Sequence, residues 1–295
     1  MKKKVLSRKM RRTLTAYMFL LPVLSVIAVF VLGPVAFTFA ISFYKWDFFT
    51  EPQFVGLSHY VDLFTRNAAF ETALWNTAKY TVLQVLLTTG MALLLAFTIT
   101  ERSNVLRIVY FLPVITSSVA AGLIWKYMYE PRYGLFNFLL ELVGFPGQPW
   151  LLDGQTSLLS IVIMDVWKAC GFYMIILLAA LKGIPSIYYD AARTDGASAW
   201  QRFKWVTVPL LKPTLVFVLI MNVLWSFQVF TSVYMLTQGG PGYSSITVNF
   251  LIYRTAFNFY RMGKACAMSV VLTLIVLAIS VFQMRAFRKG GMMEY

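Results

Sequence analysis

Six long apolar stretches constrain the fold of this 295-residue chain more than any other feature of its sequence. Each is long enough to cross the hydrocarbon core of a bilayer, which is about 30 Å thick and takes roughly 20 helical residues. With 59% hydrophobic and only 13% charged residues, the chain lies outside the range of soluble globular domains. The sequence therefore predicts an all-α membrane protein with six transmembrane helices, placed near Tyr17–Phe43, Leu74–Thr100, Ile108–Met128, Leu158–Leu181, Thr214–Leu236 and Ala265–Met284.

The first stretch follows the basic run KKKVLSRKMRR, an order that secretory signal peptides share. Its apolar core is longer than the roughly 7–15 residues of a signal peptide, and no small-x-small cleavage site follows it. We therefore predict a retained anchor helix. The expected organisation is a basic tail over residues 1–16 and a six-span transmembrane domain over residues 17–295.

Basic residues are distributed unevenly between the two ends of the predicted spans. If the N-terminus is cytoplasmic, seventeen of the 26 basic residues but only four of the 12 acidic residues fall on the cytoplasmic side. Positive cytoplasmic loops are the rule in membrane proteins, so both termini are predicted to be cytoplasmic. The same distribution explains the net charge of +14 without a nucleic-acid partner.

The sequence lacks the motifs of the common catalytic and metal sites. Its single histidine, His59, leaves no H-E-x-x-H zinc site. The Gly263–Lys264 pair lacks the pattern of a phosphate-binding loop, and no G-x-S-x-G nucleophile motif is present. We expect neither an enzyme nor a cofactor or metal site in this chain, so any ATP must be hydrolysed by another subunit.

Two charged residues, Asp165 and Lys168, fall inside the predicted fourth span. At 1.5 Å per residue they lie roughly 12 and 16 Å below its outer end. Charged residues at such depth are costly and frequently functional, and residues spaced i, i+3 share a helix face. Two interpretations remain open, namely that the pair lines a polar solute pathway or that it forms a structural ion pair.

Polar residues also interrupt the predicted fifth span. Asn222 and Ser226 are four residues apart and share a helix face, with Trp225 beside them, while Gln228 points more to the side. Such groups either form hydrogen bonds between helices or face water. Neutral hydrogen-bonding groups beside an aromatic ring are also what a sugar requires.

The segment over residues 183–209 is unusually polar for this chain. We predict a short helix capped by Ser186 and ending near Arg193, a left-handed turn at Gly196, and a second helix. Ser198 and Gln201 match a capping box, so the second helix begins there, and it is expected to end near Pro209. The residues alone fit docking to a protein partner and contact with lipid equally well.

The same segment resembles the EAA loop of permease subunits of binding-protein-dependent ABC importers, E-A-A-x3-G-x9-I-x-L-P. The match runs from Asp190 through Gly196 to Pro209 with intact spacing, and Asp190, Val206 and Val208 replace the Glu, Ile and Leu of the pattern. Four further blocks are similar to the carbohydrate-type branch, which includes the maltose and glycerol-phosphate permeases: FVGLSHYVDLF, YFLPVITSSVAAGLIWKYMY, VWKACGFYMIIL and LTQGGPG.

The resemblance implies a type I importer permease of a bacterial or archaeal plasma membrane. It implies a second homologous permease, two ATPase subunits that bind ATP and Mg, and an external solute-binding protein. Coupling to the ATPase would lie in a coupling loop over residues 183–209, at Tyr189, Asp190, Ala191, Ala192, Arg193, Asp195, Gly196 and Pro209. The resemblance places solute contacts at Phe172, Tyr173, Asn222, Trp225, Ser226 and Gln228. On the first interpretation of the buried charges, Asp165 and Lys168 also belong to the solute pathway.

The predicted function is therefore import of a sugar or sugar derivative. The alternative is an ion- or proton-coupled secondary carrier that uses Asp165 and Lys168. A membrane scaffold explains the loop but not the polar residues of the fifth span. Side chains that bind hydroxyl groups look alike across sugars, so the sequence does not select among them.

Overall fold

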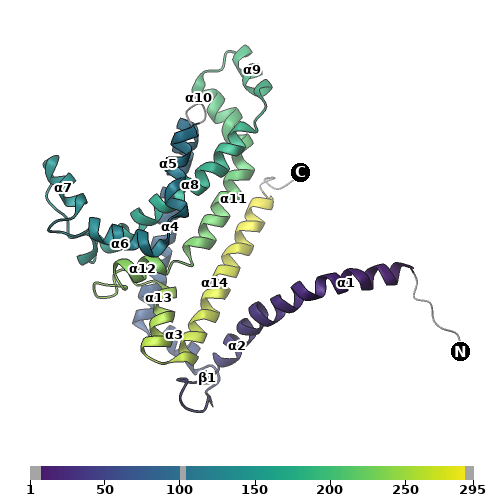
Figure 1. Ribbon diagram of the computed structural model, residues 1–295, viewed down its shortest axis with the longest axis vertical. Helices are drawn as coiled ribbons and strands as arrows, with labels where there is room; N and C mark the ends of the chain where they lie inside the picture. The colour runs from purple at the N-terminus through teal and green to yellow at the C-terminus, as the bar shows by residue number, and fades with distance from the viewer. Residues whose placement is uncertain (1–7, 100–103, 290–295) are drawn as a thin grey trace.

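A computed structural model describes residues 8–99 and 104–289 of the chain. Lys2, Lys3 and Lys4 of the predicted basic tail, Thr100 at the end of the predicted second span, and the charged residues Glu101, Arg102 and Glu294 lie outside the described residues. Within the described part the fold is almost entirely helical (Figure 1). One antiparallel pair, β1 (Tyr44–Lys45) and β2 (Gln53–Phe54), lies in the loop between α2 and α3.

The N-terminal half comprises α1 (Arg8–Ile27), the π-helical turn η1 (Ala28–Leu32), α2 (Gly33–Ile41), α3 (Ser58–Thr65), α4 (Ala68–Ile99), α5 (Asn104–Ile115), α6 (Ser118–Met128), α7 (Leu135–Leu142) and η2 (Trp150–Leu152). The C-terminal half comprises α8 (Ser157–Lys182), α9 (Ser186–Thr194), α10 (Ala199–Arg202), η3 (Phe203–Thr207), α11 (Val208–Ser226), α12 (Thr231–Leu236), α13 (Val248–Tyr253), η4 (Arg254–Asn258) and α14 (Met262–Lys289).

Five helical segments in the described residues are long and apolar enough to cross a membrane, and a bent pair makes a sixth candidate. The five are Thr15–Ile41, Ala68–Ile99, Ser157–Lys182, Ala199–Ser226 and Met262–Phe287. Figure 1 shows α9 and α10 at one end of the bundle and β1 and α3 at the other, while α1 stands apart from the remaining helices. The predicted all-α membrane fold is confirmed, and the bent pair brings the number of candidate spans to the predicted six.

The third predicted span is not one continuous helix. α5 and α6 meet at an angle of 99°. Pro113 lacks an N–H group and stops regular hydrogen bonding, while the Thr116 hydroxyl donates to the Pro113 carbonyl at 2.6 Å. Ser117 is then extended, with ψ near 132°, before α6 begins. Twelve residues of α5 reach only about 18 Å, so neither arm alone crosses the hydrocarbon core.

The fifth predicted span, Thr214–Leu236, is also wrong in its bounds. A continuous helical path begins at Ala199 and ends at Ser226, after which residues 227–230 separate α11 from α12. Pro209 lies in the first turn of α11, where its missing N–H costs little, and the π-helical turn η3 precedes it. The helix therefore runs through Pro209 instead of ending there.

Helix α8 lies at the centre of the bundle and packs on α4, α5 and α11. Toward the α9 end, an apolar cluster contains the small residues Ala92 and Ala96 of α4, with Met174 and Leu177 of α8. Against α5 the approach is closer still, because a methyl group on Gly171 would overlap the carbonyl oxygen of Tyr110. Gly171 thus lets the backbones of α5 and α8 touch.

Gly171→Ala should destabilise the fold by about 1–3 kcal/mol, because the added methyl group must push α5 away from α8. Gly90→Ala is the matched control, since nothing lies within 4 Å of a methyl group at that helical position. Alanine there should stabilise by about 0.5–1 kcal/mol. Thermal unfolding in lipid nanodiscs measures both, and equal stability of the two variants would refute the close contact.

An ion pair joins α3 to the start of α14. The Lys264 ammonium group, at the start of α14, lies 2.5 Å from a carboxylate oxygen of Asp62 on α3. This hydrogen bond lowers the pKa of the Asp62 carboxyl, with further help from the positive charges of Lys264 and Arg66. The Asp62 side chain is 37% exposed, so the pair contributes modestly to stability.

Asp62→Asn should lower stability at neutral pH by about 0.2–1 kcal/mol. A carboxyl with a lowered folded pKa stabilises the fold above its ordinary pKa of about 3.9 and loses that contribution as pH falls through the folded value. The difference between wild type and variant should therefore shrink below about pH 3.9. Unfolding measured between pH 7 and pH 3 checks this, and a difference that grows on acidification would contradict it.

Candidate functional site

A cavity of about 520 Å³ lies where α4, α8 and α11 meet the two interrupted spans. Its walls include the ends of α5 and α11 and the starts of α6 and α12. All eight residues predicted for the solute pathway line it: Asp165, Lys168, Phe172, Tyr173, Asn222, Trp225, Ser226 and Gln228. The structure thus brings together residues that are up to 63 positions apart in the sequence.

Asp165 is held by hydroxyl groups from two other helices. The Tyr80 hydroxyl of α4 donates to one carboxylate oxygen at 2.6 Å, and the Ser232 hydroxyl of α12 donates to the other, also at 2.6 Å. Tyr80 is 3% exposed and Ser232 is 7% exposed, so both bonds are shielded from solvent. Buried bonds to a charged acceptor of this kind are among the stronger ones in proteins.

Lys168 binds the backbone where α5 ends. Its ammonium group donates to the Thr116 carbonyl at 2.6 Å and to the Pro113 carbonyl at 3.4 Å. A cation is favourable at the C-terminal end of a helix, where carbonyl groups lack partners. Within the described residues Asp165 and Lys168 form no ion pair with each other, so the structural ion pair, one of the two interpretations left open by the sequence, is not formed.

The polar residues of α11 divide between packing and the cavity. The Asn222 amide is 2% exposed and donates to the Thr89 hydroxyl of α4 at 3.4 Å. The Ser226 hydroxyl donates to the Val223 carbonyl in its own helix. Trp225 is 61% exposed, and Gln228 lies beyond the end of α11, in the break before α12. Asn222 therefore both forms a hydrogen bond to a neighbouring helix and lines the cavity.

Gln84 is a cavity residue that the sequence reasoning missed. It lies on α4 four residues after Tyr80, is 4% exposed, and its Oε1 atom has no hydrogen-bond partner. A buried acceptor without a partner is costly and points to a polar ligand or water. A glutamine inside an apolar stretch was the signal that could have revealed it.

The second candidate site is the helical turn at the opposite end of α8. α9 begins after Pro185, which occupies the N-cap position without a side-chain bond, so the expected Ser186 cap is wrong. Gly196 has a φ of +74°, a left-handed conformation that suits glycine, as predicted. Ser198 and Gln201 form the predicted capping box, with bonds of 3.3 and 2.7 Å.

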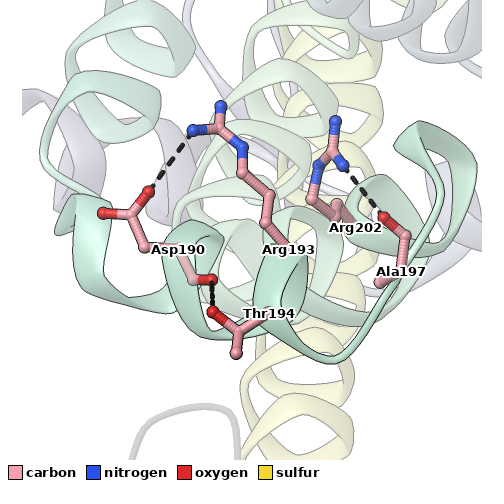
Figure 2. A network of polar contacts seen from close by, with 5 residues as sticks. All are labelled: Asp190, Arg193, Thr194, Ala197 and Arg202. Atoms are coloured by element: carbon pink, nitrogen blue, oxygen red, sulfur yellow. Dashed lines mark hydrogen bonds and ion pairs between the residues drawn. The ribbon is translucent and has the colours of Figure 1, made fainter.

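The loop residues predicted for coupling lie largely on the surface. Arg193 donates to the Asp190 carboxylate at 3.3 Å, and Arg202 donates to the Ala197 carbonyl across the turn (Figure 2). None of the α9 residues is buried. Tyr189 ties α9 to η3, because its hydroxyl lies 3.1 Å from the Thr207 hydroxyl. The polar face at Asp190 and Arg193 therefore stays open to solvent or a partner.

The helices define a multi-pass membrane protein with a polar cavity between its spans. The family model for binding-protein-dependent transport system inner membrane components matches residues 89–288. The chain belongs to this family. It is a permease component of the plasma membrane and not an enzyme.

Curated relatives match almost the whole chain. The trehalose/maltose transport system permease protein MalF of Thermococcus litoralis is 35% identical over 287 residues, covering 95% of this chain and 96% of its own. The arabinooligosaccharides transport system permease protein AraP of Bacillus subtilis is 32% identical over 275 residues, covering 91% and 87%. A crystal structure of a bacterial ABC transporter that imports alginate contains a chain of the same fold, with a TM-score of 0.83, 24% identity, and coverage of 96% and 98%.

Proposed function

We propose that this chain is the permease subunit of an ATP-driven importer of a sugar or sugar derivative and that it forms half of the translocation pathway. The observation that carries the proposal is the cavity, in which polar groups from α4, α8 and α11 converge between the spans. Its volume of about 520 Å³ lies within the roughly 300–1,000 Å³ typical of small-molecule sites. Relatives named for trehalose/maltose, arabinooligosaccharide and lactose transport support a carbohydrate substrate.

The chemistry of the cavity suits a hydroxyl-rich solute. Asn222, Gln228 and Gln84 supply amide groups that donate to and accept from hydroxyls. Trp225 and Phe172, which are 61% and 41% exposed, supply aromatic faces for the apolar side of a sugar ring. We assign solute contact to these residues together with Tyr173 and Ser226, which line the same walls.

The proposed assembly contains a second homologous permease, two ATPase subunits and an external solute-binding protein. A crystal structure of the alginate transporter in complex with a pentasaccharide-bound periplasmic protein supports the last of these. ATP and Mg would be bound by the ATPase subunits, and this chain would contribute no cofactor site. Both termini would be cytoplasmic, in a bacterial or archaeal membrane, with the transmembrane domain over residues 17–295.

The coupling loop over residues 183–209 would dock on an ATPase subunit. Ala191 and Ala192 are small and permit close approach of a partner backbone, while Asp190 and Arg193 offer exposed charge. Tyr189, Asp195 and Gly196 shape the helix and its left-handed end, and Pro209 lies where α11 begins. Because only residues 183–185 separate α9 from α8 and Tyr189 contacts η3, displacement of α9 would move α8 and α11, which line the cavity.

The self-contained secondary carrier is not retained. Family membership favours a binding-protein-dependent importer. Moreover, Asp165 and Lys168 are engaged by hydroxyl and carbonyl groups of neighbouring elements.

Gly196→Leu should uncouple ATP hydrolysis from uptake in the reconstituted transporter, because a branched side chain strains the left-handed turn that orients α9. We expect uptake per ATP hydrolysed to fall at least tenfold while the protein still inserts. Gly144→Leu is the matched control, since Gly144 has a φ of +82° and open surroundings but lies in the loop after α7. Equal loss of coupling in both variants would contradict the proposed coupling role of the loop over residues 183–209.

Asn222→Ala and Gln228→Ala should each raise the half-saturation concentration for uptake about 2- to 13-fold, the equivalent of one lost hydrogen bond of about 0.5–1.5 kcal/mol. Binding of the ATPase subunits should not change. Ser280→Ala on α14 is the control, because its hydroxyl bonds within its own helix and does not line the cavity. Unchanged transport kinetics in both cavity variants would exclude these residues from the solute site.

A further inference from the structure

Two helix breaks face α8 at the same cavity. The first lies between α5 and α6 at residues 116–117, and the second lies between α11 and α12 at residues 227–230. Val114 and Ser118 border the cavity at the first break, and Phe230 and Ser232 border it at the second. The walls of the cavity therefore depend on where the segments that follow the breaks are held.

Lys168 binds the backbone at the first break. Thr116 lies past the last residue of α5, and its carbonyl receives the Lys168 ammonium group at 2.6 Å. The Pro113 carbonyl, 3.4 Å from the same group, also accepts from the backbone and the hydroxyl of Thr116. Unpaired carbonyl groups are expensive inside a bilayer, so a cation from a neighbouring helix is a strong partner for them. Gly171, one turn further along α8, brings the backbone of α5 into contact at Tyr110.

The Asp165 carboxylate, on the same face of α8, contacts the helix that follows the second break. Asp165 accepts from Ser232, the second residue of α12, and from Tyr80 of α4. It therefore links the segment after the break to two long helices of the bundle at once. Asp165 and Lys168 are three residues apart, so a single helical turn of α8 contacts both breaks.

The segments beyond the two breaks pack on each other. α6 and α12 are in contact, and a methyl group on Gly122 of α6 would lie 2.8 Å from Cβ of Met235 on α12. We call α6 and α12 together the outer pair. Because the two helices touch closely at a glycine, we treat them as one packed unit. The outer pair is thus joined to the bundle through the two breaks. Asp165 and Lys168 add polar contacts to the packing of Trp125 on Trp167 and of α12 on α8.

We propose that Asp165 and Lys168 are positioning residues, which fix the outer pair relative to α8 and thereby set the shape of the cavity. Both carboxylate oxygens and the ammonium group are committed to protein partners. The solute is then held by the neutral amides and aromatic rings of the same cavity. This inference rests on the proposed function for the presence of a solute, but the fastening of the outer pair is independent of it.

The fastening is tested by the distance between two spin labels in the purified transporter. Leu123→Cys on α6 and Leu86→Cys on α4 place labels on exposed positions of the outer pair and the bundle, in a background with Cys170 and Cys266 replaced by alanine. Asp165→Ala and Lys168→Met should each broaden or shift the distance distribution without added sugar. Asp165→Asn and Lys168→Arg, which keep hydrogen-bonding groups, should restore most of the original distribution. An unchanged distribution in the Ala and Met variants would overturn the proposal.

Ser232→Ala tests the same link without altering either charge. It should produce part of the change seen with Asp165→Ala and add nothing when combined with it, because both substitutions remove the same bond. Additive effects of the two substitutions would overturn the link. This arm also serves if Asp165→Ala fails to fold.

Uptake kinetics separate positioning from direct solute contact. At equal amounts of assembled transporter, Asp165→Ala and Lys168→Met should lower the maximal uptake rate at least tenfold and leave the half-saturation concentration within about threefold. A selective rise in half-saturation with an unchanged maximal rate would identify the two residues as solute ligands and overturn the proposal. If no sugar is transported even by the wild-type assembly, the proposed function fails, whereas the spin-label distances still test the fastening.

Discussion

The structure depends on how the backbone polar groups at two interrupted spans are satisfied. In a bilayer, carbonyl and amide groups without partners are costly, so irregular backbone persists only where protein or a polar cavity supports it. At the break after α5 the Thr116 carbonyl receives Lys168, and at the break after α11 the carbonyls of Phe227 and Val229 receive Asn249 and Thr247. Asp165 adds a side-chain bond from Ser232 of α12. Asp165 and Lys168 come from one turn of α8. That turn and both breaks border the cavity.

Sequence reasoning succeeded where local patterns decide the structure. Hydropathy located the long helices, with Ser157–Lys182 matching the predicted fourth span to within one residue at each end. Glycine chemistry located the left-handed turn at Gly196, and the spacing of Ser198 and Gln201 located a capping box. The residues predicted for the solute pathway do line one cavity, although their role in binding stays a prediction.

Sequence reasoning failed where the structure depends on contacts between residues far apart in the chain. Hydropathy does not detect a bend, so the 99° turn after Ile115 was missed despite Pro113. Pro209 was read as a stop, yet it occupies a first helical turn that tolerates proline. The i, i+3 spacing of Asp165 and Lys168 suggested a mutual pair, but the hydroxyls of Tyr80 and Ser232 lie 85 and 67 residues away in sequence. Only the packed structure shows those contacts.

Helix α8 connects the two candidate sites. Cavity residues lie along α8, and α9 follows its C-terminal end. In the proposed importer, closure of the ATPase dimer moves α9 and thereby the walls of the cavity. The most direct test is uptake of labelled sugar into proteoliposomes that hold the complete assembly, compared with vesicles that hold this chain alone. The account predicts uptake only with the ATPase subunits, ATP and the solute-binding protein present. Concentrative uptake by this chain alone, without ATP, would contradict it.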